Sequence, residues 1–400
     1  PFGGGNPETN PNSSITRETS VRLTVDPYVK YFDKKGNRHE LKGRYYLVSI
    51  GSPDGIFATS KAQMYYGDYQ FMKRWGVKHT LTSGATASAN KVRSSSFGDH
   101  NSINMAAYAQ YDFKLNRFGA TAGVRAEYFK QDNRRPDSQF DLWDTKSEIP
   151  VYPVFRTALH YALTKTTHLR TSFGQGVRFP AVGERFTEAV SGGVTIFPNP
   201  EVQPEKGWAA EIGAKQVFKI GNWKGILDVA GFMNNYNNMI EFVFGIYNPD
   251  SVQITLTPED PGYIFNWVGF KADNTEDAQI TGLEVSFSSQ GKIKNVELSS
   301  LIGYTYMNPI SLNEDSAYLL TFSDTTTHML KYRFKHLFKA DVQATYKNIY
   351  LGVSARYNSF MSNIDRIFEA ELFGQAILPG LGQYRMENQE GSLVFDGRVG

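Results

Sequence analysis

Carboxylates and histidines in the middle of the chain are residue types that acid–base chemistry and metal binding use. Glu184 and Glu188 could act as a carboxylate pair, and His160 and His168 could ligate a metal. The acidic run 273–277 could bind calcium, but it lacks the D-x-D-x-D-G spacing of a calcium loop. For the acidic run we favour a solvated turn. The glutamates have no recognisable pocket, so we favour a pair without a catalytic role. The two histidines lie on alternating strands, and we favour positions in the lumen or at the rim over metal binding.

Other motifs of catalysis are absent from the sequence. The chain has no cysteine, which excludes disulfides, thiolate metal sites and cysteine nucleophiles. It contains no HExxH, GxSxG or P-loop, and Gly174-x-Gly176 lacks the third glycine of a dinucleotide loop. A net charge of +2 without a basic run argues against nucleic acid. We therefore expect no enzyme, no metal site and no cofactor.

The elements that position these residues alternate with period two. Residues 168–174 and 208–215 each place apolar side chains on one face and polar side chains on the other, as strands do. Between these two strands lies a long connection with prolines, which cannot donate ladder hydrogen bonds. Its prolines are Pro180, Pro198, Pro200 and Pro204. We expect the prolines to hold the connection outside the sheet.

The same pattern recurs along the chain and predicts an all-β fold of about fifteen strands. We expect an irregularity at Pro27, a long loop over 244–275 with its own hairpin at 263–271, and a helical piece near 368–373. The strands are expected at about 20–32, 39–50, 57–72, 77–90, 103–115, 118–128, 150–164, 166–178, 206–220, 223–243, 277–289, 295–307, 338–346, 349–357 and after 387.

The connections between these strands fall into two classes. Every second one is short, roughly 1–6 residues, and the others are mostly roughly 10–30 residues, with the turn at 52–55 as the exception and a polar loop at 93–101. Short turns at one rim and long loops at the other are typical of an antiparallel up-and-down transmembrane barrel. Mean hydropathy is only −0.40, but such barrels conceal their apolar band in alternation and carry aromatic girdles, and 14% of residues are aromatic.

Two segments around the proline-rich connection resemble the TonB-dependent outer-membrane receptors. Residues 176–180 (GVRFP) with Glu184, then residues 199–205 (NPEVQPE) and 211–213 (EIG), follow the family's order and spacing. Residues 278–284 and 303–306 add to the resemblance, which covers about residues 100–400, and the PEKGW run looks like receptors of the Bacteroidota. Val177 and Phe179 depart from the usual family residues beside the arginine.

The resemblance implies a twenty-two-stranded barrel in the outer membrane of a Gram-negative bacterium, filled by a plug domain. Residues 1–400 would be an internal part of that one barrel domain, with the plug and terminal strands outside this sequence. Long loops would be extracellular and short turns periplasmic. Implied partners are the TonB complex, outer-membrane lipid and lipopolysaccharide, a surface lipoprotein, and a ferric siderophore, cobalamin, glycan or peptide as ligand. No histidine lies between 169 and 327, which disfavours a haem ligand.

Ligand contacts are expected in the long loops, near 179–200, 244–262, 309–329 and 362–387. The candidate ligand-binding residues are Arg178, Glu184, Arg185, Phe197 and Asn199. The alternative, which we favour for the motif residues, is that they shape the exit from one strand and the entry to the next. At the level of function, the resemblance implies an outer-membrane receptor that binds a scarce solute in its extracellular loops and imports it with TonB energy. The alternatives are a passive porin-like channel and a soluble all-β binding protein or glycan-active enzyme.

Overall fold

Strands dominate the computed structural model, which describes residues 18–51, 59–132, 151–191, 194–249, 251–372 and 375–400. Eighteen of the described strands form one sheet. Two of these, β1 and β2, are halves of a single strand interrupted at Asp26 and Pro27, and both pair with β3. Two others, β10 and β11, form a small added hairpin. The described strands thus occupy fifteen successive positions in the wall, which confirms the all-β prediction.

All of the wall strands pair antiparallel with their neighbours in chain order. They are β1 (Thr19–Val25), β2 (Tyr28–Phe32), β3 (Arg38–Gly51), β4 (Ser60–Trp75), β5 (His79–Ser94), β6 (Gly98–Leu115), β7 (Phe118–Gln131), β8 (Tyr152–Ala162), β9 (Thr167–Arg178), β12 (Glu205–Ile220), β13 (Trp223–Ile246), β14 (Val268–Ile293), β15 (Val296–Ser311), β16 (His336–Tyr346), β17 (Ile349–Asn358) and β20 (Ser392–Val399).

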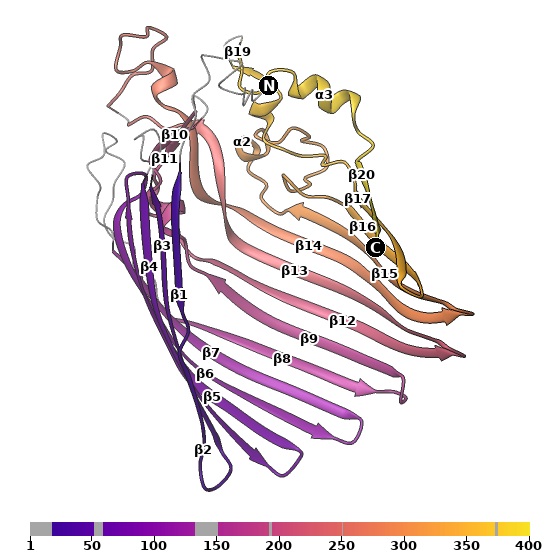
Figure 1. Ribbon diagram of the computed structural model, residues 1–400. Helices are drawn as coiled ribbons and strands as arrows, with labels where there is room; N and C mark the ends of the chain where they lie inside the picture. The colour runs from indigo at the N-terminus through magenta and orange to yellow at the C-terminus, as the bar shows by residue number, and fades with distance from the viewer. Residues whose placement is uncertain (1–17, 52–58, 133–150, 192–193, 250, 373–374) are drawn as a thin grey trace.

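The remaining elements are short and lie in the connections at one end of the sheet. Figure 1 shows the strands side by side in a strongly curved wall, with tight turns along one end and these loop elements gathered at the other. They are α1 (Val182–Phe186), β10 (Ala189–Ser191), β11 (Val194–Phe197), η1 (Ile264–Asn266), α2 (Ser316–Leu319), η2 (Arg366–Phe368), β18 (Glu371–Leu372), β19 (Gln375–Ala376) and α3 (Leu381–Glu387). None of the helices in the described ranges is long and apolar enough to cross a bilayer.

The wall has one polar and one apolar face, because directly paired residues share a face. On the polar face, Arg170 on β9 bonds to Glu211 on β12 and to Asp228 on β13, each at 2.7 Å. On the apolar face, Met105 lies opposite Tyr128, and both side chains are more than 40% exposed. The alternation predicted from the sequence is confirmed over the wall.

Short hairpins line one end of the wall, which we call the short-turn rim. Asn116, Gly221, Lys294 and Lys347 each adopt a positive φ between 50° and 58°, as tight hairpin turns require. The opposite end, the long-loop rim, carries the connections 132–151, 179–204, 247–267, 312–335 and 359–391. The predicted asymmetry between the two rims is confirmed.

One predicted loop at the long-loop rim is wrong. Only residues 95–97 join β5 to β6, since residues 91–94 and 98–101 are paired strand residues. The polar side chains of 93–101 mark the end of the apolar band, and the strands continue past it. The predicted turn at 52–55 lies outside the described residues.

Two further predictions in the loops are corrected. Residues 263–271 do not form a hairpin, because η1 is followed directly by β14, which starts at Val268 and pairs with β13. The helical piece near 368–373 is limited to the 3-10 turn η2, and β18 follows it. The longer helix, α3, lies further along the chain at Leu381–Glu387.

Candidate functional site

Strands β13 and β14 extend beyond their neighbours at the long-loop rim and support the loops. They contain 24 and 26 residues, and their ladder runs to the pair Ile246 and Val268. The register shifts around Asn237–Ile240, opposite Asn274–Glu276, mark a bulge at the base of this extension. Long loops pack against both strands of the extension, so the extension connects the loops to one another.

The proline-rich connection docks on the extension. Strand β11 pairs with β14 in parallel, with Ile196 opposite Phe270, and the Asn199 side-chain amide donates to the Ala272 carbonyl at 2.9 Å. The expectation that the whole connection lies outside the sheet is therefore wrong for β11. The four prolines of the connection take no part in the ladders, and all four are fully buried. The free edge of β14 accepts residues 195–197 because these contain no proline.

Arg178, at the end of β9, joins three segments. Its guanidinium bonds to both Glu184 oxygens, at 2.8 and 2.9 Å, and to both Glu205 oxygens, at 2.6 and 2.5 Å. Glu184 in turn accepts from the Ala181 amide, and Glu205 accepts from the Ile240 amide, both at 2.7 Å. This bidentate geometry fixes where the chain leaves β9 and where it enters β12.

Arg185 lies on α1 and is only 2% exposed. Its guanidinium donates to the Pro200 carbonyl through Nη2 and through Nε, the Nε bond measuring 2.8 Å. It also donates to Gln131 Oε1 at 3.0 Å. Burial lowers the pKa of Arg185 to about 10, and the nearby carboxylate of Asp132 opposes that shift. The buried cation thus holds α1 to the proline turn that follows it.

Sequence reasoning missed His100, which completes the core under α1. His100 is fully buried and its ring stacks on Phe186, with centroids 3.7 Å apart. One ring nitrogen lies 2.8 Å from Asp132 and the other 2.8 Å from the Phe97 carbonyl. No local signal marks this residue, because it occupies an ordinary strand position at the start of β6.

The five candidate ligand residues are thus gathered in one place, and each makes contacts within the chain. Phe197 is 1% exposed and packs against the Tyr247 ring at 5.4 Å. Burial also raises the pKa of Tyr247. In the charged pair, the Arg178 side chain is 45% exposed and is more accessible than that of Glu184. Ligand contact by these residues stays a prediction.

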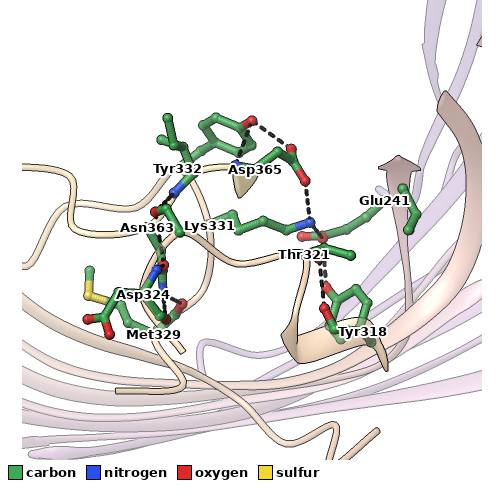
Figure 2. Close-up of polar contacts among 12 residues, drawn as sticks. Glu241, Tyr318, Thr321, Asp324, Met329, Lys331, Tyr332, Asn363 and Asp365 are labelled. Atoms are coloured by element: carbon green, nitrogen blue, oxygen red, sulfur yellow. Dashed lines mark hydrogen bonds and ion pairs between the residues drawn. The ribbon is translucent and has the colours of Figure 1, made fainter. Parts of the chain in front are cut away.

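A second cluster joins the connections 312–335 and 359–391 to β13. Lys331 is 2% exposed; its ammonium lies 2.8 Å from Asp365 Oδ1 and 3.6 Å from Glu241 Oε2. Tyr318 donates to Glu241 at 2.8 Å, and Tyr332 donates to Asp365 at 2.6 Å. Figure 2 shows these five side chains converging from two loops and one strand. We call them the Lys331 cluster.

Asn363 extends the contact between the same two loops. Its amide nitrogen donates to the carbonyls of Met329 and Asp324, at 2.7 and 3.0 Å, and its oxygen accepts from the Asp324 amide at 2.6 Å (Figure 2). Asn363 is fully buried. The sequence offered one signal here: Asp324 followed by three threonines is a turn pattern, and its carboxylate accepts from Thr326.

The turn at Asp324 should make this loop sensitive to acid. Hydrogen bonding from Thr326 lowers the pKa of Asp324. A lowered folded pKa means that the stabilisation is complete above about 4, the usual aspartate value, and is lost as pH falls through the folded pKa. Cleavage of 312–335 by an acid protease should therefore rise several-fold below pH about 4. Asp324→Asn should remove most of this pH dependence. A cleavage-against-pH profile that is the same in the variant as in the wild type would contradict the role of Asp324.

The other residues that the sequence suggested for metal binding lie apart from this rim or make structural contacts. His160 and His168 stack on each other on the polar face, with centroids 5.4 Å apart. Asp277 accepts from the Asn238 amide at 2.9 Å, at the bulge of the extension. Within the described ranges, no group of three histidine or acidic side chains is arranged to hold a metal.

Directly below Arg178, the polar face of the wall contains a groove of about 630 Å³. Its floor includes Gly174, Gly176 and Gly207, and its border includes Arg156 and Tyr236. A Cβ atom at Gly176 would meet no atom within 4 Å. The groove thus lies on the polar face of the wall and reaches the end of β9, where Arg178 lies.

Comparison with known families gives one match. Residues 4–385 match the model described as TonB dependent receptor-like, beta-barrel. No curated protein matches the chain. The match thus rests on nearly the whole sequence.

Three solved structures that share the fold are described as receptors or transporters. The copper transporter OprC superposes with a TM-score of 0.67 at 13% identity, over 96% of this chain and 57% of its own. The siderophore receptor PirA from Pseudomonas aeruginosa gives 0.60 at 10% identity, over 96% and 65%. The ferric-catecholate import receptor Fiu from E. coli K12 gives 0.60 at 13%, over 96% and 58%. The chain spans less than two thirds of each structure.

Proposed function

This chain belongs to the TonB-dependent receptor family, and from that premise we propose that it forms part of the barrel of an outer-membrane import receptor in a Gram-negative bacterium. The receptor would capture a scarce solute in its extracellular loops and import it with energy from the TonB complex. The observation that carries this proposal is the packed loop layer at the long-loop rim of the described wall, in which the cations Lys331 and Arg185 are buried.

The loop layer supports solute capture for a physical reason. Loops that bind solutes must hold their side chains in fixed positions, and buried, fully paired charges restrict the loops to one arrangement. Arg178 and the open surface of the loops 247–267 and 359–391 supply the first contacts that we propose. In the whole protein, a plug domain outside this sequence would fill the polar side of the wall and contact TonB.

The class of solute is also a proposal. The structural relatives are described as receptors or transporters for copper, siderophores and ferric catecholate. A metal complex is therefore the first class to test, before cobalamin, a glycan or a peptide. We propose no enzymatic activity, since the relatives are transporters. A surface lipoprotein partner and an origin in the Bacteroidota stay predictions.

Uptake by whole cells tests the proposal. Cells carrying the full-length protein should take up radioactive ferric siderophore, or another solute of the four classes, by a saturable process that stops when TonB is deleted. Uptake that is unsaturable and unaffected by TonB deletion would instead support the passive porin-like channel. Absence of saturable binding across all four classes would contradict the receptor function.

A further inference from the structure

One ion pair of the loop layer brings a lysine and a carboxylate together away from water. The Lys331 ammonium lies 2.8 Å from Asp365 Oδ1, and the two side chains are 2% and 6% exposed. In the other lysine–carboxylate pairs of the described residues, the lysine side chain is at least 45% exposed. Within the described part of the chain, Lys331 and Asp365 thus form the one such pair in which both partners are buried.

A second carboxylate stands beside this pair. Glu241 Oε2, on β13, lies 3.6 Å from the Lys331 ammonium, and Tyr318 donates to the same oxygen at 2.8 Å. Figure 2 shows the lysine nitrogen between the two carboxylates. In a site with little water, an ammonium and a carboxylate in contact can exchange a proton and become an uncharged amine and a carboxylic acid. Glu241 can then accept a further proton from the nitrogen while the Asp365 carboxyl keeps its own.

Backbone hydrogen bonds hold the lysine and the aspartate against each other. The amide of Tyr332 donates to the Asn363 carbonyl, and the amide of Arg366 donates to the Thr321 carbonyl, both at 2.8 Å. These two amides belong to the residues directly after the lysine and the aspartate. Two reacting groups fixed in contact behave as if present at about 10⁵–10⁸ M. The fold therefore supplies the encounter that a reaction between them requires.

The surroundings of the pair favour attack on the carboxyl group. The rings of Tyr318 and Phe322 have their centroids 5.3 Å from the lysine nitrogen, and Phe322 is fully buried. The Tyr332 hydroxyl donates to Asp365 Oδ2 at 2.6 Å. Partial burial raises the pKa of Tyr332, so this hydroxyl keeps its proton. A donor at Oδ2 stabilises the negative charge that this oxygen gains when a nucleophile adds to the carboxyl carbon.

We propose that Lys331 and Asp365 become joined by an amide bond, and that Glu241 moves the proton in this step. The uncharged Lys331 Nζ attacks the Asp365 carboxyl carbon, so that a C–N bond forms and the C–Oδ1 bond breaks. Glu241 takes a proton from Nζ and delivers it to Oδ1, which leaves with its own proton as water. Glu241 ends in the state in which it began, and the step needs no oxidant, reductant or further reactant.

The bond links the connections 312–335 and 359–391 covalently, between residues 34 apart in the sequence. Such a cross-link keeps the two loops together when they unfold locally. The inference goes beyond solute import and does not depend on it.

The mass of the full-length protein tests the inference. After unfolding, the wild-type chain should be lighter than its sequence mass by one water molecule. Tandem mass spectrometry of a protease digest should find a branched peptide that contains both Lys331 and Asp365. Lys331→Arg keeps the cation, but a guanidinium stays protonated and is no nucleophile, so this variant should have the full sequence mass. Glu241→Gln should lower the bonded fraction of freshly synthesised protein at least about tenfold.

The matched control is Lys215→Arg. Lys215 lies 3.3 Å from Asp228, but its side chain is 48% exposed, so this variant should keep the mass deficit of the wild type.

Wild-type protein of full sequence mass, with the Lys331 and Asp365 peptides recovered separately, would overturn the proposal whether or not the variants fold. A mass deficit that persists in Lys331→Arg would also overturn it, because the water would then have been lost elsewhere. An unchanged bonded fraction in Glu241→Gln would overturn the role of Glu241. Because neither solute nor TonB takes part in the measurement, failure here is distinct from failure of uptake.

Discussion

Replacing Lys331 with methionine should release the connections 312–335 and 359–391 from β13 together. Lys331 is the buried cation between the carboxylates of Asp365, which is also buried, and Glu241. Its ammonium also lies 5.3 Å from the ring centroids of Tyr318 and Phe322. Removing one partner of a buried ion pair typically costs about 3–5 kcal/mol, because the other charge stays buried and unpaired. Limited proteolysis with mass spectrometry should find new cleavage in both loops.

A matched control is available at the other rim. Lys347→Met, in the turn between β16 and β17, removes an exposed lysine over the Tyr346 ring and should leave both loops resistant. Adding Asp365→Asn to Lys331→Met should restore part of the protection, because the unpaired charge is then gone while an acceptor for Tyr332 remains. Cleavage in only one of the two loops would contradict the shared role of Lys331.

Replacing Gly269 with valine should separate β11 from β14. A Cβ atom at Gly269 would lie 1.9 Å from the Thr195 carbonyl oxygen and 2.8 Å from the Phe197 ring, so the two backbones must move apart. Overpacking in a core costs about 1–3 kcal/mol when side chains can adjust. Here the obstacle is backbone, so we expect complete loss of the β11–β14 pairing. Hydrogen exchange of residues 194–197 should accelerate to the rate that the β10–β11 hairpin allows without β14.

The control for this substitution is Gly67→Val on β4, where a Cβ would meet no atom within 4 Å. Exchange of residues 194–197 should then match that of the unmodified protein. Exchange in Gly269→Val should change little in β5 and β6, which do not contact the loop through β11. Unchanged protection of residues 194–197 in Gly269→Val would show that β11 is not held by its pairing with β14.

The sequence by itself determined the wall. The alternation around Met105 and Tyr128 placed apolar side chains on one face, and turns such as Asn116-Arg117 marked where strands reverse. Both signals are local, since facing depends on residues two apart and a tight turn on adjacent residues. The family motif likewise located Arg178, Arg185 and Asn199 at one rim, although not their partners.

Only the tertiary structure decided how the loops are built. Residues 268–276 do not alternate, and they are strand because β13 supplies their hydrogen-bond partners. Arg178 bonds to Glu205 across the proline-rich connection, and Lys331 bonds to Asp365 and Glu241 from other segments. Contacts between residues this far apart leave no periodic trace in a sequence, because each depends on where the curved wall brings the loops.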